Sequence, residues 1–189
     1  MFHDVAQKLQ APGALGVIPT DTVYGVVARA TDQVAVQRLY ELKHREGKPG
    51  TIVAANLEQL ETLGLKHRYL KAVEQYWPGA LSVVIPCGPE LQYLHQGKYS
   101  LAVRIPDHTE LQALLEQTGP LLTSSANHPG EPTSTTIKQA KDYFADEVDF
   151  YIDGGDLSAN QPSTIIRIID DAVEVLRQGA VHVKEADVA

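Results

Sequence analysis

Four short segments of the sequence carry hydroxyl groups or cations that could bind a small polar ligand. Each adjoins a predicted strand or helix, where site residues tend to collect in proteins that mix helices and strands. The first segment is Pro-Thr-Asp-Thr-Val-Tyr-Gly at residues 19–25. Its hydroxyls could hydrogen-bond a ligand while proline and glycine fix the turn. An ordinary β-turn explains the same residues.

The second segment is a basic loop in which Lys43, Arg45 and Lys48 lie within six positions. Arginine offers a planar fork of N–H donors and lysine a compact charge, and this combination suits a polyphosphate. Taken alone, a solvated basic loop is the commoner origin of such a cluster. Phosphate binding therefore needs support from other parts of the chain.

The third and fourth segments place small hydroxyl residues at the ends of predicted strands. Thr-Ser-Ser-Ala-Asn at residues 123–127 leaves an apolar run, and Gln-Pro-Ser-Thr at residues 161–164 enters another. Their side chains could donate and accept hydrogen bonds at a site. Helix capping explains the third segment equally well, and ordinary strand initiation explains the fourth.

Arg104 is the most informative single residue, because it stands between Val103 and Ile105 in an apolar run that predicts a strand. A buried guanidinium requires an anionic partner or a fixed set of hydrogen bonds. That partner is either the carboxylate of a ligand or a carboxylate of the protein itself.

Other kinds of site lack their signatures. The sequence contains no G-x-x-x-x-G-K-[ST], G-x-G-x-x-G, H-E-x-x-H or G-x-S-x-G. Its seven histidines show no i, i+4 spacing, and one cysteine, Cys87, excludes both an internal disulfide and a zinc site of several cysteines. We therefore expect no stably bound metal and a reducing, cytoplasmic setting.

The length of 189 residues suits one domain, and 43% hydrophobic and 21% charged residues are typical of a globular fold. The formal net charge of −8 argues against a broad nucleic-acid-binding face, although it leaves room for a local basic pocket. With neither a basic, apolar leader nor an apolar run of about 18 residues, export and membrane insertion are not expected.

The spacing of apolar residues and the positions of turn residues predict the elements that would hold these segments. Helices are expected around residues 2–9, 32–42, 56–64, 70–77, 107–118 and 136–144, the fifth capped by Asp107. Strands are expected at residues 14–18, 23–28, 51–55, 81–85, 100–105, 121–123, 148–152, 164–169 and 173–176, the last two as a hairpin around Asp170 and Asp171. Because several strands are separated only by turns, the expected fold is a mixed, twisted sheet flanked by helices.

Taken together and in this order, the segments resemble the YrdC/TsaC family of threonylcarbamoyl-AMP synthases. The resemblance rests on residues 19–25, Lys43-x-Arg45, Trp-Pro-Gly at 77–79, Ala-Val-Arg-x-Pro at 102–106, Ser-Ala-Asn-x-x-Gly at 125–130, Pro-Ser-Thr-Ile at 162–165 and Leu-Arg-x-Gly at 176–179. It implies an α/β fold in which a twisted mixed sheet and its flanking helices surround a large concave basin. It also implies a single domain over residues 1–189, the short form of the family.

The activity that the resemblance implies is that of an L-threonylcarbamoyladenylate synthase, a nucleotidyltransferase. L-Threonine, bicarbonate and ATP would give the adenylate and pyrophosphate, in the first step of threonylcarbamoyladenosine modification of tRNA. ATP would be a substrate that carries its own Mg²⁺. A downstream tRNA-modifying transferase complex would receive the product, contact with tRNA would be weak, and no membrane would be involved.

Site residues follow from the same resemblance. Catalytic roles fall to Lys43 and Arg45, which we expect to be solvent-accessible cations. L-Threonine would be held by Thr22, Arg104, Ser125 and Ser163, with Arg104 pairing with its carboxylate. ATP would be held by Arg45, Lys48, Ser100, Asn127, Thr135 and Arg177. The basic loop is one residue shorter than the usual form of the family and lacks the proline that commonly follows its arginine. This difference affects how Lys48 aligns with the family's motif, and leaves the alignment of Lys43 and Arg45 unchanged.

Two other functions are compatible with the same fold. The first is a non-catalytic, RNA-binding or ribosome-associated module, against which the net charge of −8 argues. The second is a carbamoyl-transfer domain of the hydrogenase-maturation type, which normally belongs to a much longer chain.

Overall fold

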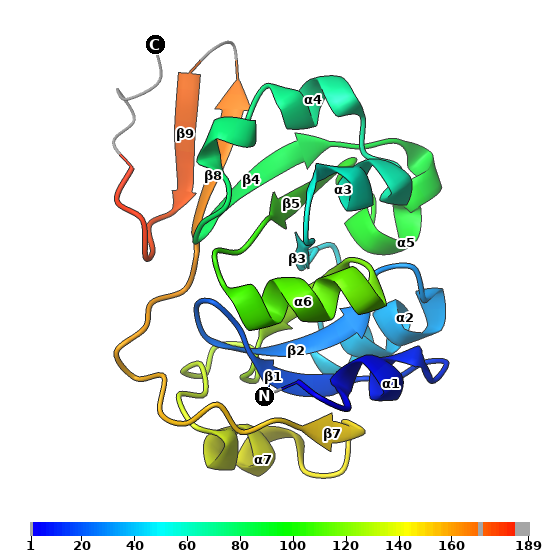
Figure 1. The fold of residues 1–189 in the computed structure, drawn as a ribbon, viewed down its shortest axis with the longest axis vertical. Helices are drawn as coiled ribbons and strands as arrows, with labels where there is room; N and C mark the ends of the chain where they lie inside the picture. Colours follow the sequence, from blue (N-terminus) through cyan, green and yellow to red (C-terminus); the bar gives the residue numbers. More distant parts are fainter. Residues whose placement is uncertain (1, 170–171, 184–189) are drawn as a thin grey trace.

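The fold is built on one twisted sheet, seen in the computed structural model, which describes residues 2–169 and 172–183. Nine strands pair in the order β7-β1-β2-β6-β3-β5-β4-β8-β9 (Figure 1). They are β1 (Gly16–Pro19), β2 (Tyr24–Arg29), β3 (Thr51–Val53), β4 (Leu81–Pro86), β5 (Ser100–Arg104), β6 (Leu121–Ser125), β7 (Phe150–Tyr151), β8 (Thr164–Ile169) and β9 (Ala172–Arg177). Pairs β1–β7, β3–β5 and β4–β8 are parallel and the others antiparallel, which confirms the predicted mixed sheet.

Within the described residues, seven α-helices and two 3₁₀ turns accompany the strands; α1 precedes the first strand and the others lie between strands. The helices are α1 (Val5–Gln10), α2 (Gln33–Leu42), α3 (Leu57–Leu63), α4 (His67–Lys71), α5 (Gln92–His95), α6 (Thr109–Thr118) and α7 (Ile137–Phe144), and the turns are η1 (Glu74–Tyr76) and η2 (Pro89–Leu91). In the part of the chain that the structure describes, no helix combines the length and apolar character needed to cross a membrane.

The alternation of side chains along the strands divides the core into two clusters, one on each face of the sheet. Val26 and Ile52 belong to the larger cluster, with side chains of α2, α3, α4 and α5. Their neighbours Val27 and Val53 belong to the smaller one, with α1 and α6. Because successive strand residues point to opposite faces, the two clusters lie on opposite sides of the sheet, and helices therefore cover both sides. In Figure 1, α6 crosses in front of the sheet.

The smaller cluster does not extend along the whole of its face. On β5, Leu101 and Val103 enter the larger cluster, so Ala102 and Arg104 point to the face that carries α1 and α6. On β6, Leu121 belongs to the smaller cluster, and Thr123 and Ser125 follow it on the same face. The remainder of this face is polar, which makes it a candidate for a ligand-binding site.

Several sequence expectations need correction. The helix expected at residues 70–77 consists of α4 and η1, and the helix expected from Asp107 is capped by His108, whose Nδ1 accepts from the Leu111 N–H at 3.2 Å. The strand expected at residues 148–152 is paired over two residues. The expected hairpin is present as β8 and β9, while its turn, at residues 170–171, lies outside the described residues.

Candidate functional site

A cavity of about 130 Å³ lies over the polar part of this sheet face. Its lining comes from strands on both halves of the sheet, from the loop between β1 and β2, and from the segment that enters β8. The polar side chains among its lining are Thr20, Thr22, Arg45, Thr51, Arg104, Thr123, Ser124, Ser125, Ser163 and Arg177. Pockets that enclose drug-sized ligands occupy about 300–1,000 Å³, so this cavity suits a ligand the size of an amino acid.

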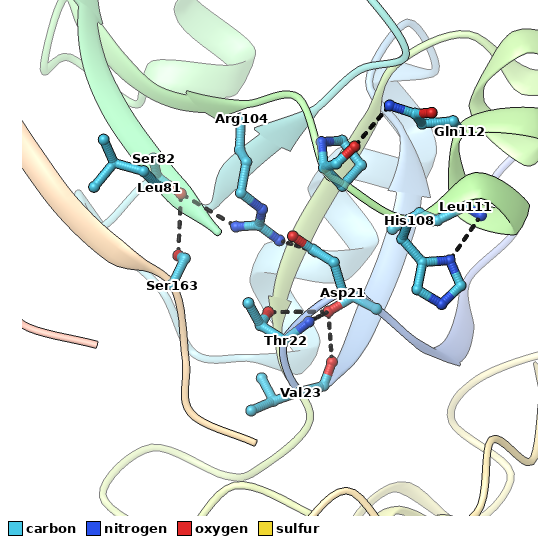
Figure 2. Close-up of polar contacts among 12 residues, drawn as sticks. Asp21, Thr22, Val23, Leu81, Ser82, Arg104, His108, Leu111, Gln112 and Ser163 are labelled. Carbon is cyan, nitrogen blue, oxygen red and sulfur yellow. Dashed lines mark hydrogen bonds and ion pairs between the residues drawn. The ribbon is translucent and has the colours of Figure 1, made fainter. Parts of the chain in front are cut away.

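Arg104 lies at the cavity wall and is held from two sides (Figure 2). Its Nη2 is 2.9 Å from Oδ1 of Asp21, and both side chains are about 95% buried, being 4% and 5% exposed. Its Nη1 donates to Oγ of Ser82 at 3.1 Å. The internal carboxylate that the sequence left open therefore exists, while Arg104 still borders the cavity. A guanidinium has five N–H donors, and these two contacts leave others for a ligand.

Ser163 joins this arrangement from the segment before β8. Its Oγ lies 3.0 Å from Oγ of Ser82 and accepts from Nη2 of Arg177 at 3.0 Å. Arg177 also donates from Nε and Nη2 to the Ser163 carbonyl, at 3.0 and 2.7 Å. A continuous chain of hydrogen bonds thus runs from Asp21 through Arg104, Ser82 and Ser163 to β9.

The loop between β1 and β2 forms the opposite side of the cavity. Thr20 is buried there, and its Oγ1 donates to the Val23 carbonyl at 2.7 Å while accepting from the Thr22 N–H at 3.2 Å. The hydroxyls of Thr20 and Thr22 lie 3.1 Å apart. These contacts hold Thr22 in a tight turn beside Asp21, facing Arg104 (Figure 2).

Lys43 is buried, which contradicts the expectation that it is a solvent-accessible cation. Only 2% of the residue is exposed. Its Nζ donates to the carbonyl oxygens of Ser125, at 2.7 Å, and Asn127. Burial, with a smaller effect from Arg45, lowers the pKa of Lys43 to about 8. Lys43 therefore holds the backbone of the loop after β6 in place. It is not among the described residues that line the cavity.

The loop after β6 is organised by the side chain of Asn127. Its Oδ1 accepts from Oγ of Ser125 at 2.6 Å, and its Nδ2 donates to the carbonyls of His128 and Glu131. Ser125 consequently reaches the cavity wall with its hydroxyl already oriented. Asn127 itself is not part of the described lining.

Arg45 connects this cavity to a larger, open groove of about 870 Å³ beside α2 and α5. Lys48 lines the groove, together with His44 and Tyr93, and is exposed. Arg45 is half-buried and donates to the Pro49 carbonyl at 3.4 Å. The basic loop therefore divides, with Arg45 at the small cavity and Lys48 outside it.

The structure brings together six of the side chains predicted from the sequence. Thr22, Arg45, Arg104, Ser125, Ser163 and Arg177 all line the small cavity. Ser100 shares the face of β5 that carries Arg104 but stands outside the described lining, as does Thr135, whose hydroxyl contacts Oε1 of Gln139 at 3.1 Å. Ser100, Thr135, Asn127 and Lys48 remain predictions as ligand contacts.

The electrostatics of the cavity favour an anion. Arg45, Arg104 and Arg177 border it. The Asp21 carboxylate, which pairs with Arg104, balances one of these three charges and is not itself among the described lining residues. Partial desolvation of its guanidinium lowers the pKa of Arg177, and repulsion from Arg104 and Arg45 lowers it further. This concentration of positive charge stands out in a chain of net charge −8, and it suits a carboxylate, a phosphate or both.

Substitution of Gly25, in β2, tests how closely the side chains pack around this cavity. A Cβ at Gly25 would lie 2.6 Å from Oγ1 of Thr123. We expect Gly25→Ala to cost about 1–3 kcal/mol of stability through overpacking and to weaken ligand binding, because Thr123 must move. Gly79→Ala is the control, since its nearest neighbour would be the Tyr76 carbonyl at 3.6 Å. Thermal unfolding and ligand titration measure both effects; an unperturbed Gly25→Ala protein would contradict the described packing.

Sequence reasoning did not single out Asp21, Ser82 and Thr20 as site residues. Asp21 and Thr20 lie in the first segment, whose hydroxyls were expected to bind a ligand as a group, but neither residue was assigned a role of its own. Ser82 was included in the strand predicted at residues 81–85. A signal existed for Ser82, because it is the polar residue in the run Leu-Ser-Val-Val-Ile. The contacts of Asp21 cross 83 positions of the chain, and no local pattern indicates them.

Comparison with known proteins gives a consistent match. A family model described as telomere recombination, Sua5/YciO/YrdC, matches residues 8–179. Threonylcarbamoyl-AMP synthase of Pseudomonas aeruginosa is 35% identical over 166 residues, which cover 86% of this chain and 89% of that protein. The enzyme of the same name from Bacillus subtilis is 32% identical over 169 residues, covering 86% of this chain and 49% of its own length.

A solved structure from the same family also matches the fold of this chain. Sua5 of Pyrococcus abyssi, crystallised in complex with L-threonine, superposes with a TM-score of 0.81 at 32% identity. The match covers 93% of this chain and 53% of that one. This chain therefore spans about half the length of the archaeal and Bacillus proteins and most of the length of the Pseudomonas protein.

Proposed function

Because this chain belongs to the Sua5/YciO/YrdC family, we propose that it is a threonylcarbamoyl-AMP synthase acting on L-threonine, bicarbonate and ATP. The observation that carries the proposal is the small cavity, in which three guanidinium groups and several hydroxyls converge on a space of about 130 Å³. Its size suits an amino acid, and its charge suits the carboxylate of that amino acid with the phosphates of a nucleotide beside it.

Threonine would occupy the cavity itself. Its carboxylate would pair with the donors of Arg104 that Asp21 and Ser82 leave free, and Ser163 would add a further contact. Thr22 and Ser125, across the cavity, would contact the rest of the amino acid. The pairing of Arg104 with Asp21 supports this arrangement, because it orients the guanidinium before the ligand arrives.

ATP would lie along the rim where the cavity meets the basic loop. Arg45 and Arg177 line the cavity, so they are the cations best placed to contact phosphate oxygens, and Mg²⁺ would arrive on the nucleotide. Lys43 would act by holding the Ser125–Asn127 backbone in place. Lys48, Ser100, Asn127 and Thr135 would complete the nucleotide site as the triphosphate extends from the cavity.

The reaction would then proceed in two steps. The neutral amine of threonine attacks the carbon of bicarbonate or of the CO₂ derived from it, with loss of water in total, and forms a carbamate. A carbamate oxygen next attacks the α-phosphorus of ATP and expels pyrophosphate. Charge that develops on the phosphates during this displacement is stabilised by cations already in place, and no protein side chain becomes covalently attached.

The product would feed the modification of tRNA adenosine through a downstream transferase complex. We place the protein in the cytoplasm, and we treat residues 1–189 as a single catalytic domain. Neither assignment is needed for the chemistry of the cavity.

Product analysis tests the proposed function. With ¹³C-labelled bicarbonate, L-threonine and ATP, we expect an adenylate that carries both the threonyl group and one ¹³C atom, detected by mass spectrometry. A threonyl adenylate without the label would contradict carbamate formation. A second expected result is that omission of bicarbonate removes the adenylate.

RNA binding provides a separate prediction. The isolated protein should bind generic RNA weakly, because an acidic chain releases few counterions and its arginines face a small cavity. Titration of a labelled single-stranded RNA at several salt concentrations measures this. Tight binding with a steep salt dependence, unchanged by ATP, would favour an RNA-binding module instead.

A further inference from the structure

We propose that Ser82 and Thr20 are positioning residues that fix the direction of two hydroxyls in the cavity, so that Ser163 faces a ligand as a hydrogen-bond donor and Thr22 as an acceptor. The inference rests on the proposed function, because the ligand it orients is the threonine of that reaction. It follows from counting the protons and lone pairs of four hydroxyl groups.

On one side of the cavity, the count begins at Arg104, which can only donate. Ser82 Oγ therefore accepts from Arg104 Nη1, at 3.1 Å. Ser82 is completely buried, and its remaining side-chain contact among the described residues is Ser163 Oγ at 3.0 Å. The single proton of Ser82 must therefore be donated to Ser163, since it would otherwise be buried without a partner.

Ser163 then has both of its lone pairs occupied. One accepts the proton from Ser82, and the other accepts from Nη2 of Arg177 at 3.0 Å. Within residues 2–169 and 172–183, the proton of Ser163 has no acceptor, and the residue lines the cavity. Ser163 is therefore directed to donate this proton to a ligand, which is the requirement for binding a carboxylate oxygen.

On the other side, the count begins at Thr20. Its only side-chain proton is donated to the Val23 carbonyl at 2.7 Å, because a carbonyl oxygen can only accept. Its contact with Thr22 Oγ1, at 3.1 Å, must therefore have Thr22 as the donor. The hydroxyl proton of Thr22 is thus used in the bond to Thr20. Thr22 lines the cavity and can offer a ligand only its lone pairs, as an acceptor.

Ser125 follows the same rule as Thr22. It donates to Oδ1 of Asn127 at 2.6 Å and so presents an acceptor to the cavity. Acceptors therefore lie toward β2 and β6, whereas donors lie toward β5, β8 and β9. Figure 2 shows Arg104 between Ser82 and Ser163 on one side and Asp21 and Thr22 on the other.

This polarity selects one orientation of an amino acid. The carboxylate, which only accepts, fits against Ser163 and Arg104, and an N–H or O–H group fits against Thr22 and Ser125. In this scheme, the ligand contacts neither Ser82 nor the hydroxyl proton of Thr20, which is donated to Val23. Their effect is exerted through Ser163 and Thr22, which is why we describe them as positioning residues.

The test compares L-threonine with L-threonine amide, whose uncharged amide can donate as well as accept. Both are titrated by calorimetry into the wild-type protein and into Ser82→Ala. We expect the variant to bind threonine about tenfold more weakly, as for the loss of one oriented hydrogen bond, and to discriminate less between acid and amide. Ser82→Thr, which restores the hydroxyl, should recover both properties.

Thr20→Val tests the acceptor side in the same way. It should weaken threonine binding by about tenfold, and Thr20→Ser should restore it. Thr118→Val is the matched control, because the Thr118 hydroxyl, at the end of α6, is also buried but has the carbonyls of Leu114 and Gly119 as its acceptors, at 3.1 and 2.8 Å, and Thr118 is not among the described lining of the cavity. Affinity for ATP should be unchanged in all of these proteins.

The outcomes separate this proposal from the proposed function. Wild-type affinity and wild-type acid preference in Ser82→Ala would overturn the positioning role alone. Equal losses for threonine and ATP, with a lowered melting temperature that Ser82→Thr does not correct, would overturn it as well and indicate a purely structural residue. A wild-type protein that binds no threonine would overturn the proposed function, and this inference with it.

Discussion

Arg104→Ala should abolish threonine-dependent turnover and lower the stability of the fold at the same time. The substitution leaves the Asp21 carboxylate buried and unpaired, with its side chain 5% exposed, and removal of one partner of a buried ion pair costs about 3–5 kcal/mol. It also removes the donors expected to bind the threonine carboxylate. Chemical denaturation and threonine titration measure the two effects separately.

Arg104→Lys separates binding from stability. It keeps a positive charge near Asp21 but loses the planar fork of donors, so threonine affinity should fall far more than ATP affinity. Arg167→Ala is the matched control, because its ion pair with Glu174 is exposed, at 44% and 46%, and should contribute less than about 1 kcal/mol. Equal losses of threonine and ATP affinity in Arg104→Lys would assign Arg104 a structural role.

Arg45→Ala should reduce adenylate formation about a hundredfold or more while leaving the fold intact. Arg45 is half-buried at the cavity, and within the described part of the chain its side chain makes one long hydrogen bond, to Pro49, so little structural support is lost. Removal of one contact to charge that develops in a transition state typically costs about 2.7–4 kcal/mol. Pyrophosphate release at saturating ATP measures the effect.

Lys43→Ala provides the contrast to Arg45→Ala. It leaves the carbonyls of Ser125 and Asn127 without their buried donor, so we expect lower stability together with lower turnover. Arg68→Ala, at an exposed position on α4, should change neither property. If Arg45→Ala keeps normal turnover, its assignment to the phosphates is wrong.

The sheet was largely predictable because its strands are short apolar runs between turn residues. The runs at residues 81–85 and 100–105 became β4 and β5 almost without change. The segment of η2 and α5 gave no such signal, because two short elements provide too few residues for a helical period. At the start of α6, the sequence indicated Asp107 as the cap. His108 occupies the N-cap position instead, and histidine is not among the residues that usually mark a helix start.

The candidate site was predictable to the extent that local motifs mark it. Hydroxyl-rich segments and Arg104 indicated side chains that the fold brings to one cavity. The burial of Lys43 was not predictable, because it depends on the loop after β6, more than 80 positions away. The pairing of Arg104 with Asp21 was not predictable either. An arginine in an apolar strand indicates that an anionic partner is needed, but it does not identify that partner.

The most direct test of this account is pyrophosphate release measured with each substrate omitted in turn. We expect release only when ATP, L-threonine and bicarbonate are all present, with one pyrophosphate formed for each threonylcarbamoyl-adenylate. Arg104→Lys should require a higher threonine concentration for the same rate. Release from ATP that is independent of threonine or of bicarbonate would contradict the assignment of the cavity and of the reaction.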